Sequence, residues 1–283
     1  MIRIKKGLDI PINGSPAEDI TDSKNSRSVA ILGNDYVGMK PTMLVEEGQQ
    51  VKLGQPLFED KKNPGVVITS PAGGKVESIN RGDRRVLQSI VIEIDSNEES
   101  IEFNRVDPNQ ISNTSSAVIS KQLIDSGMWT AFRTRPYSKV PAINSLPANI
   151  FISALDTQPL SPNPETIIKL HKDDFDFGIL ILKKLTNCPI HLSVSENSSL
   201  DIQEDDQLKK HIVSGPHPAG LVGTQTHFIS PASLSIINWT IGYQDVTAIG
   251  KLFNTGYLSV ERIISLAGPQ VIEPTYVKTR LGA

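Results

Sequence analysis

The chain has 283 residues, with 28 Lys and Arg against 31 Asp and Glu, a formal net charge of -3, 38% hydrophobic residues and 21% charged residues. This composition predicts a folded chain of about two domains, and the lack of a basic block disfavours nucleic acid as a partner. No apolar run approaches the ~18 residues of a membrane span, and no secretory signal is found at the start of the sequence. The single cysteine, Cys188, excludes an internal disulfide and a cysteine-based metal site. A cytosolic location fits these observations.

After an N-terminal segment, residues 1–28, the pattern of residues 29–97 predicts a β-domain. Short apolar runs such as VAILG, LFED, VVITS, KVESI and VIEID alternate with glycine and proline turns about every ten residues, which is typical of a sandwich or barrel. Residues 45–79 resemble the biotinyl and lipoyl carrier domains, whose central hairpin presents one modified lysine. Here that hairpin holds Lys61 and Lys62 but is longer and contains Asn63-Pro64-Gly65. Either one lysine carries a prosthetic group, or the fold is retained with both lysines in solvent.

Residues 98–147 form a third part: a polar linker, a helix and a loop rich in Trp and Arg. Ser115 or Ser116 can cap a helix over residues 115–126, which Gly127 ends. In the loop of residues 126–141, aromatic residues alternate with basic ones: Trp129, Phe132, Arg133, Arg135, Tyr137 and Lys139. This pattern suits a flat aromatic ligand with carbonyl acceptors, but it equally suits a clamp that fixes the β-domain to the next domain.

Residues 148–256 predict an α/β domain. Strands are expected in NIFISAL, CPIHLSV, HIVSG and SIINWTI, with helices over residues 164–186 and 243–253. Strands that alternate with helices indicate a mostly parallel, Rossmann-like sheet. The tail, residues 257–283, is again rich in β-forming residues.

Motifs for catalysis, nucleotides or metals are lacking. The glycine-rich loop GPHPAGLVG, residues 215–223, contains prolines that remove main-chain N–H donors, so it is a structural loop or, less favoured, an anion site. His217 and His227 are candidates to meet at one strand end, or are hydrogen-bonded structural histidines. The histidine spacings do not match a metal site, and Cys188 is expected to be a buried, inert thiol.

Several long strings together identify a family. They are KKGLDIPI (5–12), YVGMKPTM (36–43), LFEDKKNPGV (57–66), NRGDRRVLQSIVIE (80–93), LIDSGMWTAFRTRPYSKVPAI (123–143), GPHPAGLVGTQTHF (215–228), YQDVTAIGKLF (243–253) and SLAGPQV (265–271). Over its whole length the chain resembles the A subunits (NqrA) of the sodium-translocating NADH:quinone oxidoreductases.

The resemblance implies a component of a six-subunit complex that oxidises NADH, reduces ubiquinone and exports Na⁺. This component is expected to be peripheral, on the cytoplasmic face of the bacterial inner membrane, docked to membrane subunits and associated with quinone binding. It is not expected to be catalytic alone, because NADH, the flavins and the iron-sulfur centre are held by other subunits. The implied fold is multidomain α+β, with a barrel-sandwich hybrid of the biotinyl/lipoyl type and a Rossmann-like domain resembling the flavoprotein subunit of complex I. It is expected to include the start of a β-grasp-like (SLBB) domain, which continues past the position of residue 283 in members of the family.

The resemblance also shapes the expected site. Flavin-binding relatives have a glycine-rich segment where this chain has residues 125–141, so we expect bulky side chains to exclude flavin here. The hypothesised quinone site comprises Trp129, Phe132, Arg133, Arg135, Tyr137, His217 and His227, with Arg133 or Arg135 donating to a quinone carbonyl and Phe132 and Tyr137 flanking the ring. No catalytic, cofactor-binding or metal-binding residue is expected. The alternatives are a purely structural docking scaffold and a biotinyl- or lipoyl-type carrier.

Overall fold

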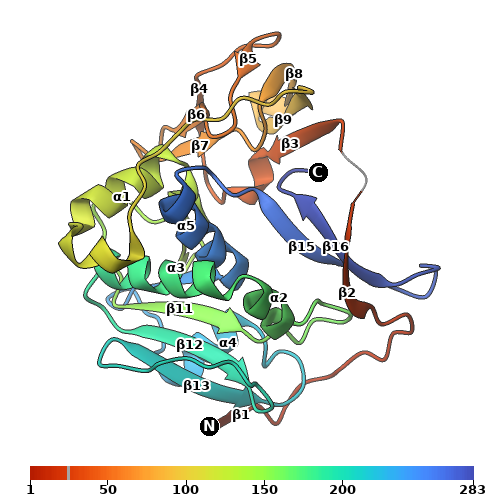
Figure 1. Ribbon diagram of the computed structural model, residues 1–283, viewed down its shortest axis with the longest axis vertical. Coiled ribbons are helices and arrows are strands. Elements are labelled where there is room, and N and C mark those ends of the chain that lie inside the picture. Colours follow the sequence, from red (N-terminus) through yellow and green to blue (C-terminus); the bar gives the residue numbers. More distant parts are fainter. Residues whose placement is uncertain (24–25) are drawn as a thin grey trace.

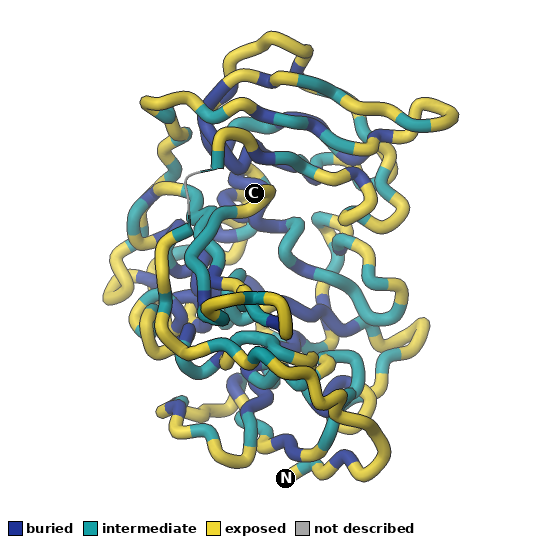
Figure 2. Tube along the Cα trace, turned by 90° about the vertical axis from the view of Figure 1, so that its right-hand side faces the viewer, coloured by how far each residue is buried: buried dark blue, intermediate teal, exposed yellow. Residues whose placement is uncertain are grey.

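The computed structural model describes residues 1–23 and 26–283. A β-sandwich lies at one end of the molecule, a larger α/β sheet lies at the other, and a small three-stranded sheet lies between them, with the N-terminus beside the α/β sheet and the C-terminus near the sandwich (Figure 1). Buried residues concentrate inside the sandwich and around the α/β sheet, whereas the outer loops are exposed (Figure 2). Within the described residues, the helices are too short or too polar to cross a membrane.

The sandwich confirms the predicted β-domain. Its two sheets have the strand orders β3-β9-β8-β5 and β4-β6-β7. The strands are β3 (Ser28–Leu32), β4 (Pro41–Met43), β5 (Gln50–Val51), β6 (Pro56–Asp60), β7 (Val67–Thr69), β8 (Gly74–Arg81) and β9 (Leu87–Ile94). Apolar residues from both sheets, such as Phe58 and Ile90, are fully buried between them and form the core of this domain.

The α/β sheet has the order β1-β13-β12-β11-β14-β10, in which β10 alone pairs antiparallel. Its strands are β1 (Ile2–Arg3), β10 (Arg133–Arg135), β11 (Asn149–Ala154), β12 (Ile190–Ser195), β13 (Leu208–Ser214) and β14 (Asn238–Gly242). All four strands predicted for this domain are present and parallel. The chain moves from β11 to β12 and β13 on one side and then returns to β14 on the other, so the order reverses between β11 and β14.

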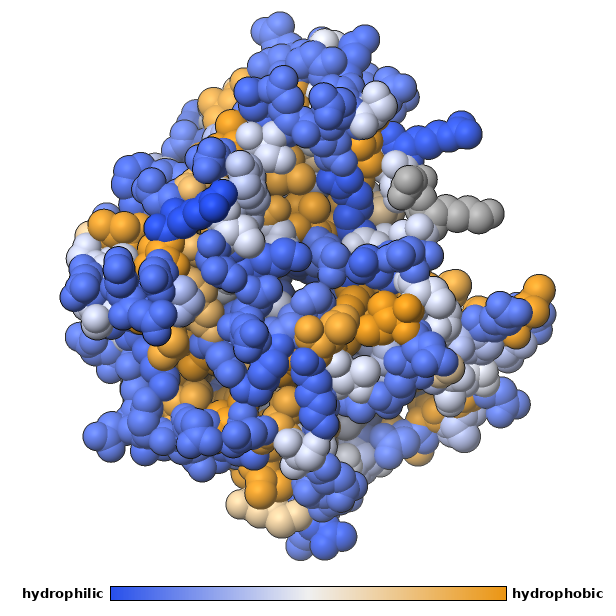
Figure 3. All heavy atoms as spheres, in the orientation of Figure 1, coloured by the Kyte–Doolittle hydropathy of each residue, from blue (hydrophilic) through white to orange (hydrophobic). Residues whose placement is uncertain are grey.

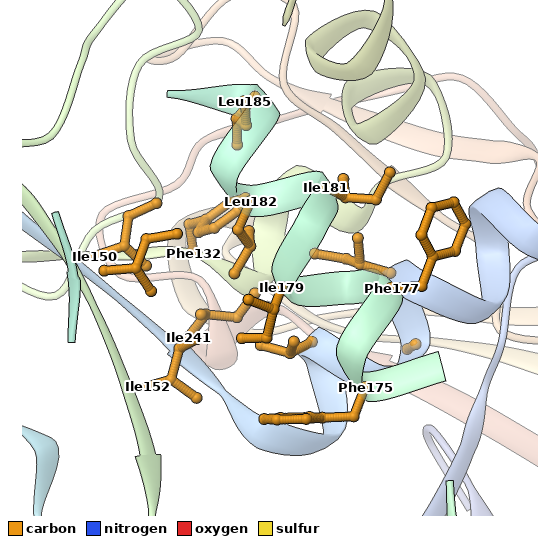
Figure 4. Packing of buried hydrophobic residues seen from close by; sticks show 14 of the residues in the cluster. Phe132, Ile150, Ile152, Phe175, Phe177, Ile179, Ile181, Leu182, Leu185 and Ile241 are labelled. Atoms are coloured by element: carbon orange, nitrogen blue, oxygen red, sulfur yellow. The ribbon is translucent and has the colours of Figure 1, made fainter. Parts of the chain in front are cut away.

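The helices of this domain are α1 (Ser116–Asp125), α2 (Pro164–Leu170), α3 (Lys172–Leu185), α4 (Val222–Ile229) and α5 (Tyr243–Thr255). Ile150 and Ile152 of β11 join the core formed with α3 and α5 (Figure 4). Ser153, the next residue along β11, accepts a hydrogen bond from Gln225 of α4, at 2.9 Å. Because successive strand residues point to opposite faces, α4 covers the other face of the sheet.

Local signals explain several helix ends. The Ser115 side chain caps α1 as predicted, accepting from the Val118 N–H at 3.4 Å. The predicted helix over residues 164–186 is two helices, because His171 adopts φ -122° and ψ 37° and interrupts it. Helix α5 ends at Gly256, whose φ of +80° suits glycine.

The N-terminal segment and the tail together make the third sheet. Strand β2 (Ala17–Asp22) pairs parallel with β16 (Thr275–Arg280), which pairs antiparallel with β15 (Glu261–Leu266). Residues 1–23 therefore contribute one strand to the α/β sheet and another to the tail sheet, which the sequence did not predict. That this sheet begins a β-grasp-like domain stays a prediction.

The outer face seen in Figure 3 is mainly hydrophilic. Its apolar atoms form separate patches, one of them at the tip of the β15–β16 hairpin, where Ile272 is 96% exposed. The apolar residues of the two main domains are mostly gathered in their cores instead.

Candidate functional site

The two large rings of the Trp/Arg-rich loop are buried in the α/β core. Trp129 lies within a short 3₁₀ turn (Met128–Ala131) and Phe132 follows it, and their ring centroids lie 5.4 and 5.3 Å from that of Trp239 in β14. Phe132 is fully buried among the residues of β11 and α3 (Figure 4). The Trp129 indole N–H donates to the Pro141 carbonyl at 2.9 Å. These rings hold the loop in place and are not walls of an open site.

Arg133 turns the other way, towards the sandwich. Its guanidinium group donates to the carbonyl oxygens of Thr130, of Phe132 at 3.0 Å and of Asp35 at 3.4 Å. It also lies over the Tyr36 ring, 6.0 Å from the centroid. Arg133 therefore links the loop to the segment that follows β3.

A cleft of about 600 Å³ opens beside Arg133. Its floor is formed by the carboxyl ends of β11 and β14 and by the residues that begin α4 and α5, and its other walls come from the sandwich, the Trp/Arg-rich loop and the tail. The cleft thus lies where the strand order of the α/β sheet reverses, the position at which open α/β sheets bind ligands.

The loop lines this cleft with Gly127, Met128, Thr130, Ala131 and Arg133, while Trp129 and Phe132 point into the core. The two large rings therefore do not fill the cleft, contrary to that part of the expectation. The absence of flavin, and its exclusion by the other side chains of the loop, stay predictions.

The polar groups of the cleft are arranged around two arginines. Arg262 of β15 is paired with Asp245 of α5 at 2.6 Å, whereas the hydrogen bonds of Arg133 within the described residues go to main-chain carbonyls. Burial raises the pKa of Tyr36 to about 12, although Arg133 opposes this shift, so the phenol is neutral and can donate. Such a site can bind a planar, neutral ring through its carbonyl oxygens.

Of the seven residues proposed from the sequence, Arg133 is the one that lines the cleft in the described part of the chain. Arg135 lies farther along β10, paired with Asn238, and Tyr137 is 64% exposed in the turn that follows.

The two histidines also lie outside the cleft lining. His217 contacts the Thr157 hydroxyl through Nδ1 at 3.1 Å, in the loop after β13. His227 is exposed in the last turn of α4, where it packs edge-on against Phe228. The structure therefore does not bring the seven residues together, and their roles in quinone binding stay predictions.

Sequence reasoning missed Asp35, Tyr36 and Arg262. Asp35 ends the 3₁₀ turn Gly33–Asp35 that comes after β3, and Tyr36 follows this turn, so a polar and aromatic pair just after a strand could have marked them as candidates. Arg262 carries no such signal, because it reaches the cleft only when the tail folds back over the α/β domain.

The hairpin that resembles a carrier turn is fastened to the α/β domain. Lys61 and Lys62 are exposed. The Asn63 amide donates to the carbonyls of Val140 and Pro141 at 3.2 and 3.0 Å, which ties the turn to the end of the Trp/Arg-rich loop. A swinging arm needs a turn that projects freely, so this contact disfavours the carrier alternative. Among the described residues, no group of three or more His, Cys, Asp or Glu side chains could hold a metal ion.

Comparisons with known proteins give two family matches. Residues 2–95 match the NqrA N-terminal barrel-sandwich hybrid domain, and residues 114–258 match the NqrA second alpha/beta domain. Proteins named as the A subunit of Na(+)-translocating NADH-quinone reductase are similar over the whole chain: 54% identical in Photorhabdus laumondii, and 50% in Yersinia pseudotuberculosis and Histophilus somni. The chain spans 63% of the length of these relatives.

Proposed function

Because the chain belongs to the NqrA family, the A subunits of the Na⁺-translocating NADH-quinone reductases, we propose that it is part of such a complex and that its cleft binds the quinone head group. The complex oxidises NADH, passes electrons through flavins and an iron-sulfur centre on its other subunits to ubiquinone, and exports Na⁺. The chain is peripheral, docks to membrane subunits of the six-subunit complex at the cytoplasmic face, and is not catalytic alone.

The observation that carries the quinone proposal is the position of Arg133 at the edge of the cleft where the strand order of the α/β sheet reverses. A guanidinium group has five N–H donors, and within the described part of the chain Arg133 makes three hydrogen bonds, one of them a long contact of 3.4 Å to Asp35. Donors therefore remain for a ligand carbonyl, and the neutral Tyr36 phenol lies under the same group. A fixed cation also stabilises the negative charge that a quinone gains on reduction.

The charges of the cleft support a chain without flavin. Asp35, Asp156 and Asp245 border the cleft together with two arginines, and one of these arginines is already paired. Asp245 also lies in the first turn of α5, where a phosphate would otherwise meet the positive end of the helix. A flavin mononucleotide would bring a doubly charged phosphate towards these carboxylates. Flavin absorbance of the purified chain at near-stoichiometric amount would contradict this part of the proposal.

Quinone titration of Arg133 variants tests the site. Losing a hydrogen bond to a charged group costs about 1.5–3 kcal/mol, so Arg133→Met is expected to weaken the binding of ubiquinone-1 at least about tenfold in isothermal titration calorimetry. Arg135 lies two residues farther along the same strand and outside the cleft lining, so the site proposed here no longer includes it. Arg135→Met is therefore the matched control and is expected to leave the affinity unchanged. Equal affinities of wild type and Arg133→Met would refute the site.

One observation favours a second function, that of a docking scaffold. Arg133 and Asn63 both bridge the sandwich and the α/β domain, as a purely structural clamp would. A scaffold predicts that Arg133→Met lowers the free energy of unfolding and prevents assembly, with no quinone binding by the wild-type chain. A carrier, in contrast, requires added mass on Lys61 or Lys62, which intact-mass spectrometry detects.

A further inference from the structure

The segment between β1 and β2 runs along the outside of the molecule (Figure 1). The Leu8 N–H donates to the His217 carbonyl at 3.0 Å, and the Asp9 carboxylate accepts from the His217 N–H at 2.8 Å. Farther along, the Gly14 carbonyl accepts from the Gly268 N–H at 3.0 Å. These hydrogen bonds hold the segment as a fixed part of the surface.

Three apolar side chains of this segment are open to solvent. Leu8 is 71% exposed, Ile10 is 57% exposed and Ile12 is 39% exposed. None of them belongs to a hydrophobic core of the described residues, whereas Ile2 and Ile4, which precede them, pack in one. A surface that covered the three side chains would gain the free energy of removing apolar area from water.

Three cations come directly before these apolar side chains. Arg3, Lys5 and Lys6 are exposed, and the ion pairs of the described residues do not include them. The first twelve residues contain one carboxylate, Asp9, which is bonded to His217, and the anchoring loop, residues 215–221, contains none. This part of the surface is therefore positive, although the chain has a net charge of -3.

Positive charge beside exposed apolar side chains suits an anionic bilayer better than another protein. The cores of protein interfaces are depleted of lysine, and a second copy of this chain would place the same cations against each other. At an anionic bilayer, in contrast, Lys and Arg are attracted to the headgroups, while nearby apolar side chains enter the boundary with the acyl chains. The long stem of lysine can also lie along apolar surface with its amine at a phosphate.

We propose that this surface binds directly to anionic phospholipids. The N-terminal strip, as we call it, comprises Arg3, Lys5, Lys6, Leu8, Ile10 and Ile12. Its cations contact the phosphate groups, and its apolar side chains enter the boundary between headgroups and acyl chains. This lipid contact is additional to docking on membrane subunits, and it does not depend on the quinone site.

The lipid contact ends before the β15–β16 turn. This turn lies next to Gly14 through the Gly268 N–H, and it carries the exposed carboxylate of Glu273. Anionic headgroups repel a carboxylate, so the tip of this hairpin stays outside the contact.

Co-sedimentation of the 283-residue chain with lipid vesicles tests the proposal. The chain is expected to bind vesicles of phosphatidylglycerol and not those of phosphatidylcholine, and added NaCl is expected to weaken the binding, because salt screens the charges. Each Lys or Arg near an anionic surface strengthens binding about fivefold, so Lys5→Glu with Lys6→Glu should weaken it at least about 25-fold. Leu8→Ser with Ile10→Ser should weaken it about tenfold or more.

Each pair of substitutions has a matched control. Lys61→Glu with Lys62→Glu makes the same change of charge at two adjacent exposed lysines of the sandwich and is expected to retain binding. Leu234→Ser removes a leucine that is 80% exposed in the loop before β14, at the amino end of that strand, and is also expected to retain binding. All the substituted side chains are exposed, so the fold is expected to persist, which circular dichroism checks.

The vesicles contain no quinone and no other subunit, so their result is independent of the proposed function. No binding to phosphatidylglycerol, or equal binding to the two lipids, would overturn the proposal and would leave a protein as the partner of this surface. Equal weakening in the strip variants and in their controls would overturn it as well. Unchanged binding in Leu8→Ser with Ile10→Ser would show that the apolar side chains do not enter the bilayer.

Discussion

Replacing Phe132 with leucine separates a structural role of this ring from a role in ligand binding. Phe132 is fully buried, and its ring centroid lies 5.7 Å from that of Trp129 and 5.3 Å from that of Trp239. Each aromatic pair contributes about 0.5–1.5 kcal/mol beyond its buried area, so losing both pairs predicts a loss of about 1–3 kcal/mol in the free energy of unfolding. Truncation to alanine adds a cavity and raises the expected loss to about 3–5 kcal/mol.

Urea denaturation followed by tryptophan fluorescence measures this loss. The chain has two tryptophans, Trp129 and Trp239, and both belong to this cluster, so the signal reports the α/β core directly. The quinone affinity of folded Phe132→Leu is expected to equal that of the wild type, because the ring does not line the cleft. A loss of quinone affinity of about tenfold at unchanged stability would refute this assignment.

Three further predictions concern packing and pH. Asn63→Ala should lower the free energy of unfolding by about 1–2 kcal/mol in urea denaturation, because the carbonyls of Val140 and Pro141 lose their donor. Unchanged stability would show that these hydrogen bonds do not anchor the hairpin turn at Asn63. Gly250→Ala should lower the free energy of unfolding by about 3 kcal/mol or more, or prevent folding, because a Cβ at this position overlaps the Asp174 carbonyl of α3. Gly223→Ala in α4 is the control: a Cβ there meets open space, so the same assay should show unchanged or higher stability. Burial, and to a lesser extent the charge of His211, lowers the pKa of His191 to about 4, below its unfolded value near 6.5. The free energy of unfolding should therefore fall as the pH drops from 7 to 5, and His191→Gln should remove on the order of 1 kcal/mol of that fall. The same pH dependence of stability in the variant and the wild type would contradict this.

The parts of the fold that depend on local pattern were predictable. The β-domain followed from turn residues about every ten positions, and the parallel strands of the α/β domain followed from short apolar runs between helices. Two elements escaped prediction for physical reasons. Strand β2, AEDITD, has no apolar alternation and forms only because β16 supplies its hydrogen bonds. Helix α4 is short, begins without a side-chain cap and contains a glycine, so its local signals are weak.

The site was predictable only at Arg133. An alternation of rings and arginines does not show which side chains turn inwards, and here Trp129 and Phe132 turn to the core while Arg133 turns to the cleft. That choice is made by tertiary packing against Trp239, which lies far along the chain. The cleft itself needs the sandwich, the loop, the strand ends and the tail to assemble, and no local pattern carries that information.

A structure of the chain with ubiquinone-1 bound would show whether the cleft beside Arg133 is the quinone site. We expect density for the ring in this cleft, with a carbonyl oxygen within hydrogen-bond distance of the Arg133 guanidinium group. An empty cleft at saturating quinone, or a ring bound at another place on the chain, would contradict it.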